Sequence, residues 1–151
     1  MSTFKTRLQA DLTEAIRARD ELRSSTLRLT LTAVTNEEVA GKEARQLSDD
    51  EVLKIVVREA KKRREAAEAF DQGNRPEQAA RERAEGEVLA EYLPQQLGDA
   101  ELAEIVRAAI AETGASGPSA MGQVMKVVRP KVGDRAEGGR IAAEIKAQLG
   151  S

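Results

Sequence analysis

The sequence predicts an all-α protein, in which an N-terminal, four-helix bundle-like domain precedes a small domain of three helices. Apolar residues recur three and four positions apart along nearly the whole chain, which is typical of amphipathic helices. No segment alternates apolar and polar residues as a half-buried strand would. Residues that start and stop helices, above all Gly and Pro, lie between the apolar stretches. These three observations exclude a sheet-based fold class.

The first three helices follow from this spacing and from their start and stop signals. Ser2 or Thr3 is placed to cap the first helix, and the polar run after Gly41 ends the second. Ser48 and Glu51 have the spacing of a capping box, which predicts the start of the third helix. The apolar positions are Phe4, Leu8, Leu12 and Ile16, then Leu27, Leu31 and Val34, then Val52, Ile55, Val56, Ala66, Ala67 and Phe70.

The fourth helix leads to the predicted domain boundary. Pro76 suits the first turn of a helix, where its missing amide costs nothing, and Pro94 ends the apolar pattern of this helix. The segment from Pro94 to Gly98 resembles a hinge. We therefore predict an N-terminal domain at residues 1–94 and a C-terminal domain at residues 95–151.

Three shorter helices are predicted in the C-terminal domain. The fifth is capped by Asp99 and ends at Gly114, the sixth ends at Pro130, and the seventh follows Gly138 and Gly139. The apolar positions are Leu102, Ile105, Val106, Ala109 and Ile110, then Met121, Val124, Met125 and Val128, then Ile141, Ile145 and Leu149.

The composition excludes several kinds of chemistry. The chain has no Cys and no His, so it lacks thiolate chemistry and the commonest metal ligand and general base. No Gly-rich loop has Walker spacing, and neighbouring carboxylates on a helix point about 100° apart. We expect no catalytic residue, cofactor or metal site. Since no apolar run approaches the ~20 residues that cross a bilayer, we also expect a cytoplasmic protein.

The charges are unevenly distributed. Residues 65–119 hold 4 Lys/Arg and 12 Asp/Glu, whereas residues 120–151 hold 6 and 3, although the net charge is only -2. The basic C-terminal segment could meet an anionic partner, or it could be an ordinary solvated surface. A helix start in this segment could hold a phosphate, or its glycines could simply serve turns. The residues alone leave both alternatives open.

A second charged feature lies on the third helix. Glu59 and Arg63 are separated by one helical turn and fall on its apolar side, where helices should pack. We interpret them as a partly buried structural ion pair that fixes the register of the helices; a ligand site is the alternative.

Three blocks of the sequence resemble the YqeY family of small bacterial proteins. They are LSDDEVLKIVVREAKKRREAAEAFDQGNRPE, VLAEYLPQQL and AETGASGPSAMGQVMKVVRPKVGDRAEGG, in the family's order and at its spacing. The segment after residue 98 also resembles the tail domain of GatB, a subunit of the glutamine-dependent aminoacyl-tRNA amidotransferase.

The resemblance implies an all-helical protein with a link to tRNA, because the GatB tail domain helps to hold the tRNA body. The motif of the tail domain, matched position by position, falls on Gly122, Gln123, Met125, Lys126, Lys131, Arg135 and Ala136. With the nearby cations, the candidate RNA-binding residues are Gly122, Lys126, Arg129, Lys131, Arg135 and Arg140. Asp134 departs from the family pattern, which more often has a glycine there.

The resemblance also associates the chain with an enzyme activity, that of a carbon–nitrogen ligase with glutamine as amide donor. The sequence shows no counterpart of the GatB cradle that binds ATP, so we expect that this chain does not catalyse the reaction alone. We expect a non-catalytic adaptor that binds tRNA or an aminoacyl-tRNA-handling enzyme. The alternatives are a protein–protein interaction module with no RNA role, or an auxiliary subunit of an amidotransferase.

Overall fold

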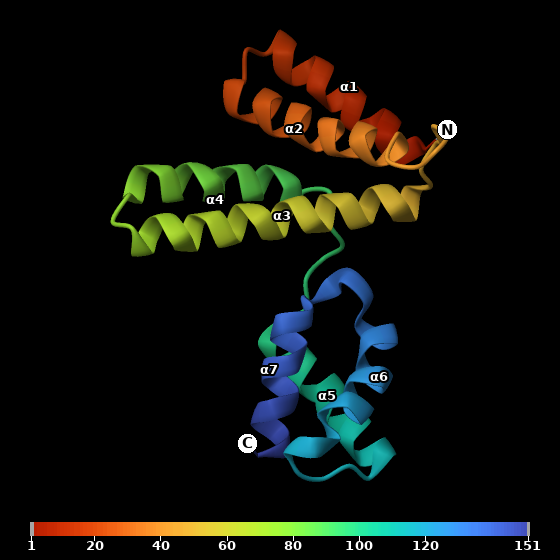
Figure 1. Ribbon diagram of the computed structural model, residues 1–151. Helices are drawn as coiled ribbons and strands as arrows, with labels where there is room; N and C mark the ends of the chain where they lie inside the picture. The colour runs from red at the N-terminus through yellow and green to blue at the C-terminus, as the bar shows by residue number, and fades with distance from the viewer. Residues whose placement is uncertain (1, 151) are drawn as a thin grey trace. The chain divides into compact units, whose positions relative to one another are not determined.

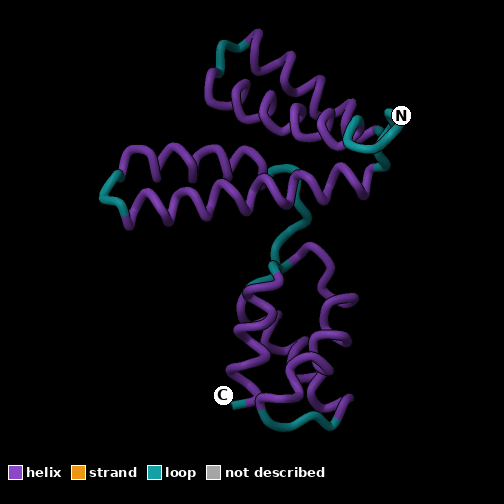
Figure 2. Tube along the Cα trace, in the orientation of Figure 1, coloured by secondary structure: helices purple, strands orange, loops and turns teal. Residues whose placement is uncertain are grey.

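The computed structural model describes residues 2–150 and confirms the all-α fold class, because these residues form helices and loops and no strand (Figures 1 and 2). The contacts within the chain divide it into two compact units between Leu93 and Pro94. Independent folding of domains at 1–94 and 95–151 stays a prediction.

The first unit contains four helices, and the second contains three helices and two short 3₁₀ turns. The helices of the first unit are α1 (Thr3–Arg17), α2 (Glu21–Glu38), α3 (Asp49–Gln72) and α4 (Pro76–Ala90). The elements of the second unit are α5 (Asp99–Thr113), η1 (Pro118–Ala120), α6 (Met121–Val132), η2 (Gly133–Arg135) and α7 (Gly138–Leu149).

The first unit consists of two helical hairpins, α1–α2 and α3–α4, that pack on each other (Figure 1). Its core is almost entirely aliphatic, as the low aromatic content requires, with Tyr92 as the one buried aromatic residue. The buried core residues are Leu8, Leu27, Val34, Leu47, Val52, Ile55, Val56, Val88, Leu89 and Tyr92.

The predicted helix starts of the first unit are confirmed. Ser48 caps α3 with a full capping box: its Oγ accepts from the Glu51 amide at 3.2 Å, and Glu51 Oε1 accepts from the Ser48 amide at 3.1 Å. Ser2 caps α1 by accepting from the Lys5 amide at 3.1 Å. Pro76 occupies the first turn of α4.

In the second unit, α5, α6 and α7 surround a separate aliphatic core (Figure 1). The core residues are Leu97, Leu102, Val106, Ala109, Val124, Val128, Val132, Ala136, Ile141 and Ile145. The chain enters this unit along the turn that follows α6, because the Leu97 amide donates to the Arg135 carbonyl at 2.8 Å. This hydrogen bond therefore holds the entry segment at Leu97 against the turn at Arg135.

Three predicted boundaries in the second unit are wrong. Pro130 does not end α6, which continues to Val132. Proline removes only one amide near the end of the helix, and the burial of Val128 and Val132 on the same face stabilises the last turn. Gly138 and Gly139 are the first two residues of α7 instead of its approach. Gly98, not Asp99, is the N-cap of α5, and Asp99 lies in the first turn.

Candidate functional site

Helix α6 presents two faces that differ sharply in character. Val124, Val128 and Val132 lie one turn apart and are fully or almost fully buried. With 100° between successive residues, Gly122, Lys126 and Arg129 fall together on the opposite side. All three are exposed. The structure therefore brings half of the candidate RNA-binding residues onto one surface, which we call the open face of α6.

The cations on this open face have no neutralising partner among the described residues. Neither Lys126 nor Arg129 forms an ion pair with any residue in the range 2–150. Arg129 Nη2 lies 3.2 Å from the position that a Cβ on Gly138 would occupy, so the guanidinium reaches the first residue of α7. The start of α7 carries partial positive charge and has no side-chain cap. Glu137, the N-cap residue of α7, places a carboxylate at the same point, so Arg129 lies beside a helix start that carries both signs of charge.

Gly122, one of the candidate RNA-binding residues, lies in the first turn of α6. A Cβ built at this position would meet no described atom of the chain within 4 Å. No part of the described chain therefore requires a glycine here, and the space beside the helix is open.

Lys131 points in a different direction from Lys126 and Arg129. Its Nζ lies 3.1 Å from Glu112 Oε2 on α5, in an exposed pair whose side chains are 49% and 59% accessible. Exposed ion pairs of this kind contribute only about 0–1 kcal/mol. A phosphate group could therefore replace Glu112 at small cost, but Lys131 is not a free cation.

Arg135 closes the C-terminal end of α6. Its Nη2 donates to the Lys131 carbonyl at 2.8 Å, and its Nε donates to the Val132 carbonyl at 3.3 Å. The last carbonyls of a helix have no partner within the helix, and a cation there also interacts favourably with the helix dipole. Arg135 is thus engaged in structure, although it remains exposed.

Arg140 joins α7 to the start of the unit. Its Nη2 donates to the Leu97 carbonyl at 2.9 Å and to Asp99 Oδ1 at 3.0 Å. Of the five candidate cations, Lys126 and Arg129 have no ion pair within residues 2–150, whereas Lys131, Arg135 and Arg140 have partners there. Glu112, Asp99 and the Leu97 carbonyl were missed, because these contacts join elements distant in sequence. The carbonyl partners of Arg135 lie only three and four residues away and were missed as well.

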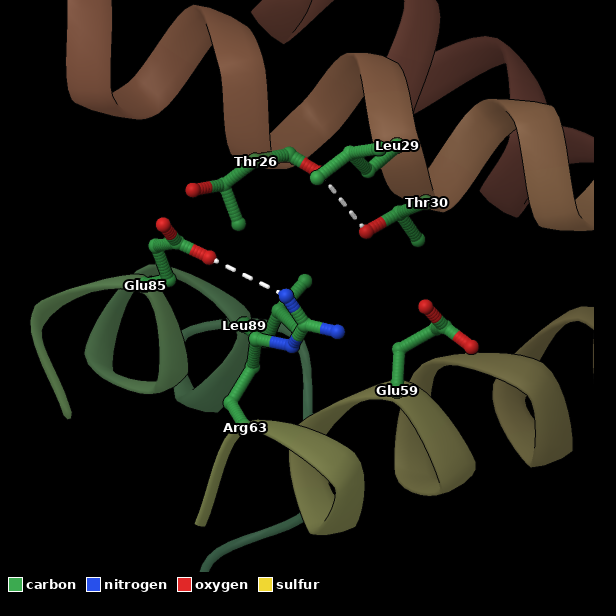
Figure 3. A pocket seen from close by; sticks show the side chains of 7 residues that line it. All are labelled: Thr26, Leu29, Thr30, Glu59, Arg63, Glu85 and Leu89. Atoms are coloured by element: carbon green, nitrogen blue, oxygen red, sulfur yellow. Dashed lines mark hydrogen bonds and ion pairs between the residues drawn. The ribbon is translucent and has the colours of Figure 1, made fainter. Parts of the chain in front are cut away.

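The second predicted feature, the pair Glu59 and Arg63, lies in the first unit between α2, α3 and α4 (Figure 3). The structure gives Arg63 two partners on α4: its Nη1 lies 3.3 Å from Glu85 Oε2 and 3.4 Å from Glu82 Oε2. Glu59, which is 8% exposed, lies 3.1 Å from Lys62 Nζ. Arg63 does lie where helices pack, as expected, but its partners cross to the neighbouring helix.

Two kinds of feature are absent from the described residues. Residues 2–150 contain no group of three or more His, Cys, Asp or Glu side chains arranged to hold a metal ion. Within the same range, no helix combines the length and apolar character that a membrane-spanning segment needs.

A comparison with protein families gives one match. The family described as Yqey-like protein matches residues 5–149, which is nearly the whole chain. The match includes both units and all seven α-helices apart from the first two residues of α1. No curated protein matched the chain. We conclude that the chain belongs to the family of YqeY-like proteins.

Proposed function

We propose that this protein is a non-catalytic adaptor that binds tRNA through the open face of α6. The observation that carries the proposal is the position of Lys126 and Arg129, which are exposed, share one face and have no ion pair among the described residues. Cations without an internal partner are available to neutralise phosphates and to release the counterions around them. The resemblance of the C-terminal segment to the GatB tail domain supports tRNA as the polyanion.

The contact would be made to the RNA backbone instead of the bases. Sequence-specific binding of single-stranded RNA relies on aromatic side chains that stack on bases. The aromatic residues of the chain are Phe4, Phe70 and Tyr92, all of which precede residue 94. The second unit would therefore recognise shape and phosphate positions.

The remaining candidate cations take different roles in this proposal. Lys131 can exchange its exposed carboxylate partner for a phosphate, so it contributes a weaker contact. Arg135 and Arg140 hold the turn and α7 in place, and their replacement acts mainly on the shape of the surface.

We further propose that the reaction centre, where one is involved, belongs to an aminoacyl-tRNA-handling enzyme of the amidotransferase type. The purified chain, incubated with glutamine, ATP and misacylated tRNA, is then expected to transfer no amide nitrogen until a catalytic partner is added. Turnover by the chain alone would contradict the adaptor role.

A titration of a tRNA transcript at several salt concentrations tests the proposed surface. The double variant Lys126→Gln with Arg129→Gln should bind more weakly. Its plot of log K against log[salt] should be shallower by roughly 0.7–0.9 for each lost phosphate contact. The control is Arg107→Gln with Lys146→Gln, which removes the same charge from exposed positions on α5 and α7 and should leave the slope unchanged.

Two results would overturn the proposal. One is an equal loss of affinity in both double variants, which would indicate a nonspecific effect of net charge. The other is an absence of tRNA binding by the wild-type chain. In that case, partner proteins that remain bound after nuclease treatment would favour a protein–protein interaction module.

A further inference from the structure

A small cavity lies between α2 and the α3–α4 hairpin, beside Glu59 and Arg63 (Figure 3). It is lined by Thr26, Leu29, Thr30, Glu59, Arg63, Glu85 and Leu89. The cavity offers about 10 Å³ to the centre of a water-sized sphere, which is close to the smallest volume that holds one water molecule. This space is too small for a larger ligand, and the exposed side chain of Leu29 forms part of its wall.

Two buried polar atoms of the cavity residues have no hydrogen-bond partner among residues 2–150. They are Glu59 Oε2, an acceptor, and Arg63 Nε, a donor. Lys62 Nζ lies 3.1 Å from Glu59 Oε2, but in an orientation that makes no hydrogen bond. Buried polar groups in folded proteins almost always have a partner in the protein or in ordered water. Glu59 Oε2 thus keeps only an ion pair and Arg63 Nε has no hydrogen bond, so both atoms could bind a partner outside the chain.

Thr30 supplies a third polar group. Its hydroxyl donates to the Thr26 carbonyl at 2.9 Å, and its oxygen keeps the capacity to accept (Figure 3). A buried water needs two to four polar partners. The cavity offers acceptors on Glu59 and Thr30 and a donor on Arg63, with Leu29 and Leu89 as apolar walls.

We propose that one buried water molecule occupies this cavity and bridges Glu59 and Arg63. The water donates to Glu59 Oε2 and Thr30 Oγ1 and accepts from the Arg63 guanidinium. Such bridges are nearly as favourable in enthalpy as direct hydrogen bonds. The site thereby connects α2 to both helices of the α3–α4 hairpin, and it completes indirectly the pairing of Glu59 with Arg63 that their spacing suggests.

A bound cation is disfavoured by the charges around the cavity. The carboxylates of Glu59, Glu82 and Glu85 already face cations of the chain: Lys62 on the first, and Arg63 on the other two. Arg81 adds a second cation beside Glu85, with Nε 3.2 Å from Oε1. A neutral ligand that both donates and accepts hydrogen bonds fits these groups better than a cation does.

Nuclear magnetic resonance on the full chain tests the proposal. The experiment measures magnetisation transfer from water to the methyl groups of Leu89. Leu89 is 1% exposed, so a cross-peak between its methyl protons and water reports a buried water. The cross-peak is expected in the wild type. It should be lost in Thr30→Val, which replaces the accepting oxygen with a methyl group. Thr32→Val is the matched control, because Thr32 lies on the exposed side of α2 and makes the same type of hydrogen bond, to the Arg28 carbonyl at 2.9 Å.

Nuclear magnetic resonance and crystallography each decide whether the cavity contains a water molecule. A cross-peak that survives in Thr32→Val and disappears in Thr30→Val supports the water bridge. Absence of the cross-peak in the wild type, or its persistence in Thr30→Val, overturns it. A high-resolution crystal structure gives an independent result that does not depend on any variant. Density between Glu59 and Arg63 supports the proposal, and an empty cavity or a direct contact between the two side chains refutes it.

Discussion

The hydroxyl of Tyr92 donates a hydrogen bond of 2.5 Å to Asp11 Oδ2, and this contact ties the end of α4 to α1. The Arg7 guanidinium carbon lies 4.6 Å from the centre of the Tyr92 ring, and Arg23 Nη2 donates to the Tyr92 hydroxyl at 3.4 Å. The segment that leads out of the first unit therefore starts from a well-anchored residue.

Replacing Tyr92 with Phe should destabilise the first unit by about 1.5–3 kcal/mol, because it removes the hydrogen bond to the Asp11 carboxylate and the longer one from Arg23. The pH dependence of the free energy of unfolding tests the role of the Tyr92 hydroxyl more specifically. Burial and the hydrogen bond to Asp11 raise the pKa of Tyr92 to about 12. The unfolded chain loses this proton near pH 10, so the free energy of unfolding should fall as the pH rises from about 10 to about 12. Denaturant titrations should show this fall in the wild type and a smaller one in Tyr92→Phe.

Asp49 should control the stability of the first unit in acid. Hydrogen bonds from the hydroxyls of Ser2 and Thr3 and from the Phe4 amide lower the pKa of Asp49 to about 2. A lowered pKa contributes stability that is present above about pH 4 and is lost as the pH falls toward 2. Asp49→Asn should lower the melting temperature at neutral pH and reduce its decline in this window. The exposed neighbour Asp50 provides the control: Asp50→Asn should leave the acid decline unchanged.

Two core truncations test whether the units fold as separate domains. Leu27 and Ile145 are both fully buried, the first in the core of residues 2–93 and the second in that of residues 94–150. Each change to Ala should cost about 2–5 kcal/mol, from lost burial and the cavity left behind. If the domain boundary is correct, hydrogen exchange should accelerate only in the unit that carries the change. Faster exchange in both units would mean that they unfold together.

Replacing each of two glycines of the second unit with Ala should change the stability of this unit in opposite directions. Gly114 ends α5 with a φ of +65°, so Gly114→Ala should cost about 1 kcal/mol or more. Gly122 lies in α6 with open space around it, so Gly122→Ala should stabilise the unit by up to about 1 kcal/mol. Thermal unfolding measures both effects. A loss of tRNA affinity in Gly122→Ala, despite its greater stability, would indicate that a partner approaches α6 closely at this residue.

The helices could be predicted from local signals in the sequence, whereas the partners of the surface cations could not. Apolar spacing and the Ser48 capping box depend on residues within one or two turns, so the sequence displays them directly. Pro130 was misjudged because burial of Val128 and Val132, a tertiary effect, outweighs the local cost of proline. The partners of Lys131 and Arg140 lie 19 and 41 residues away. No helical periodicity reports contacts at such separations, so a list of basic residues could not separate Lys126 and Arg129 from the others.

The anchoring of Tyr92 has a practical consequence for spectroscopy. The chain has one Tyr and no Trp, and this Tyr is 5% exposed in the core of the first unit. Intrinsic ultraviolet fluorescence therefore reports the unfolding of residues 2–93 and is nearly silent for residues 94–150. A melt followed by this emission, compared with one followed by circular dichroism, would give the transitions of the two halves without any label.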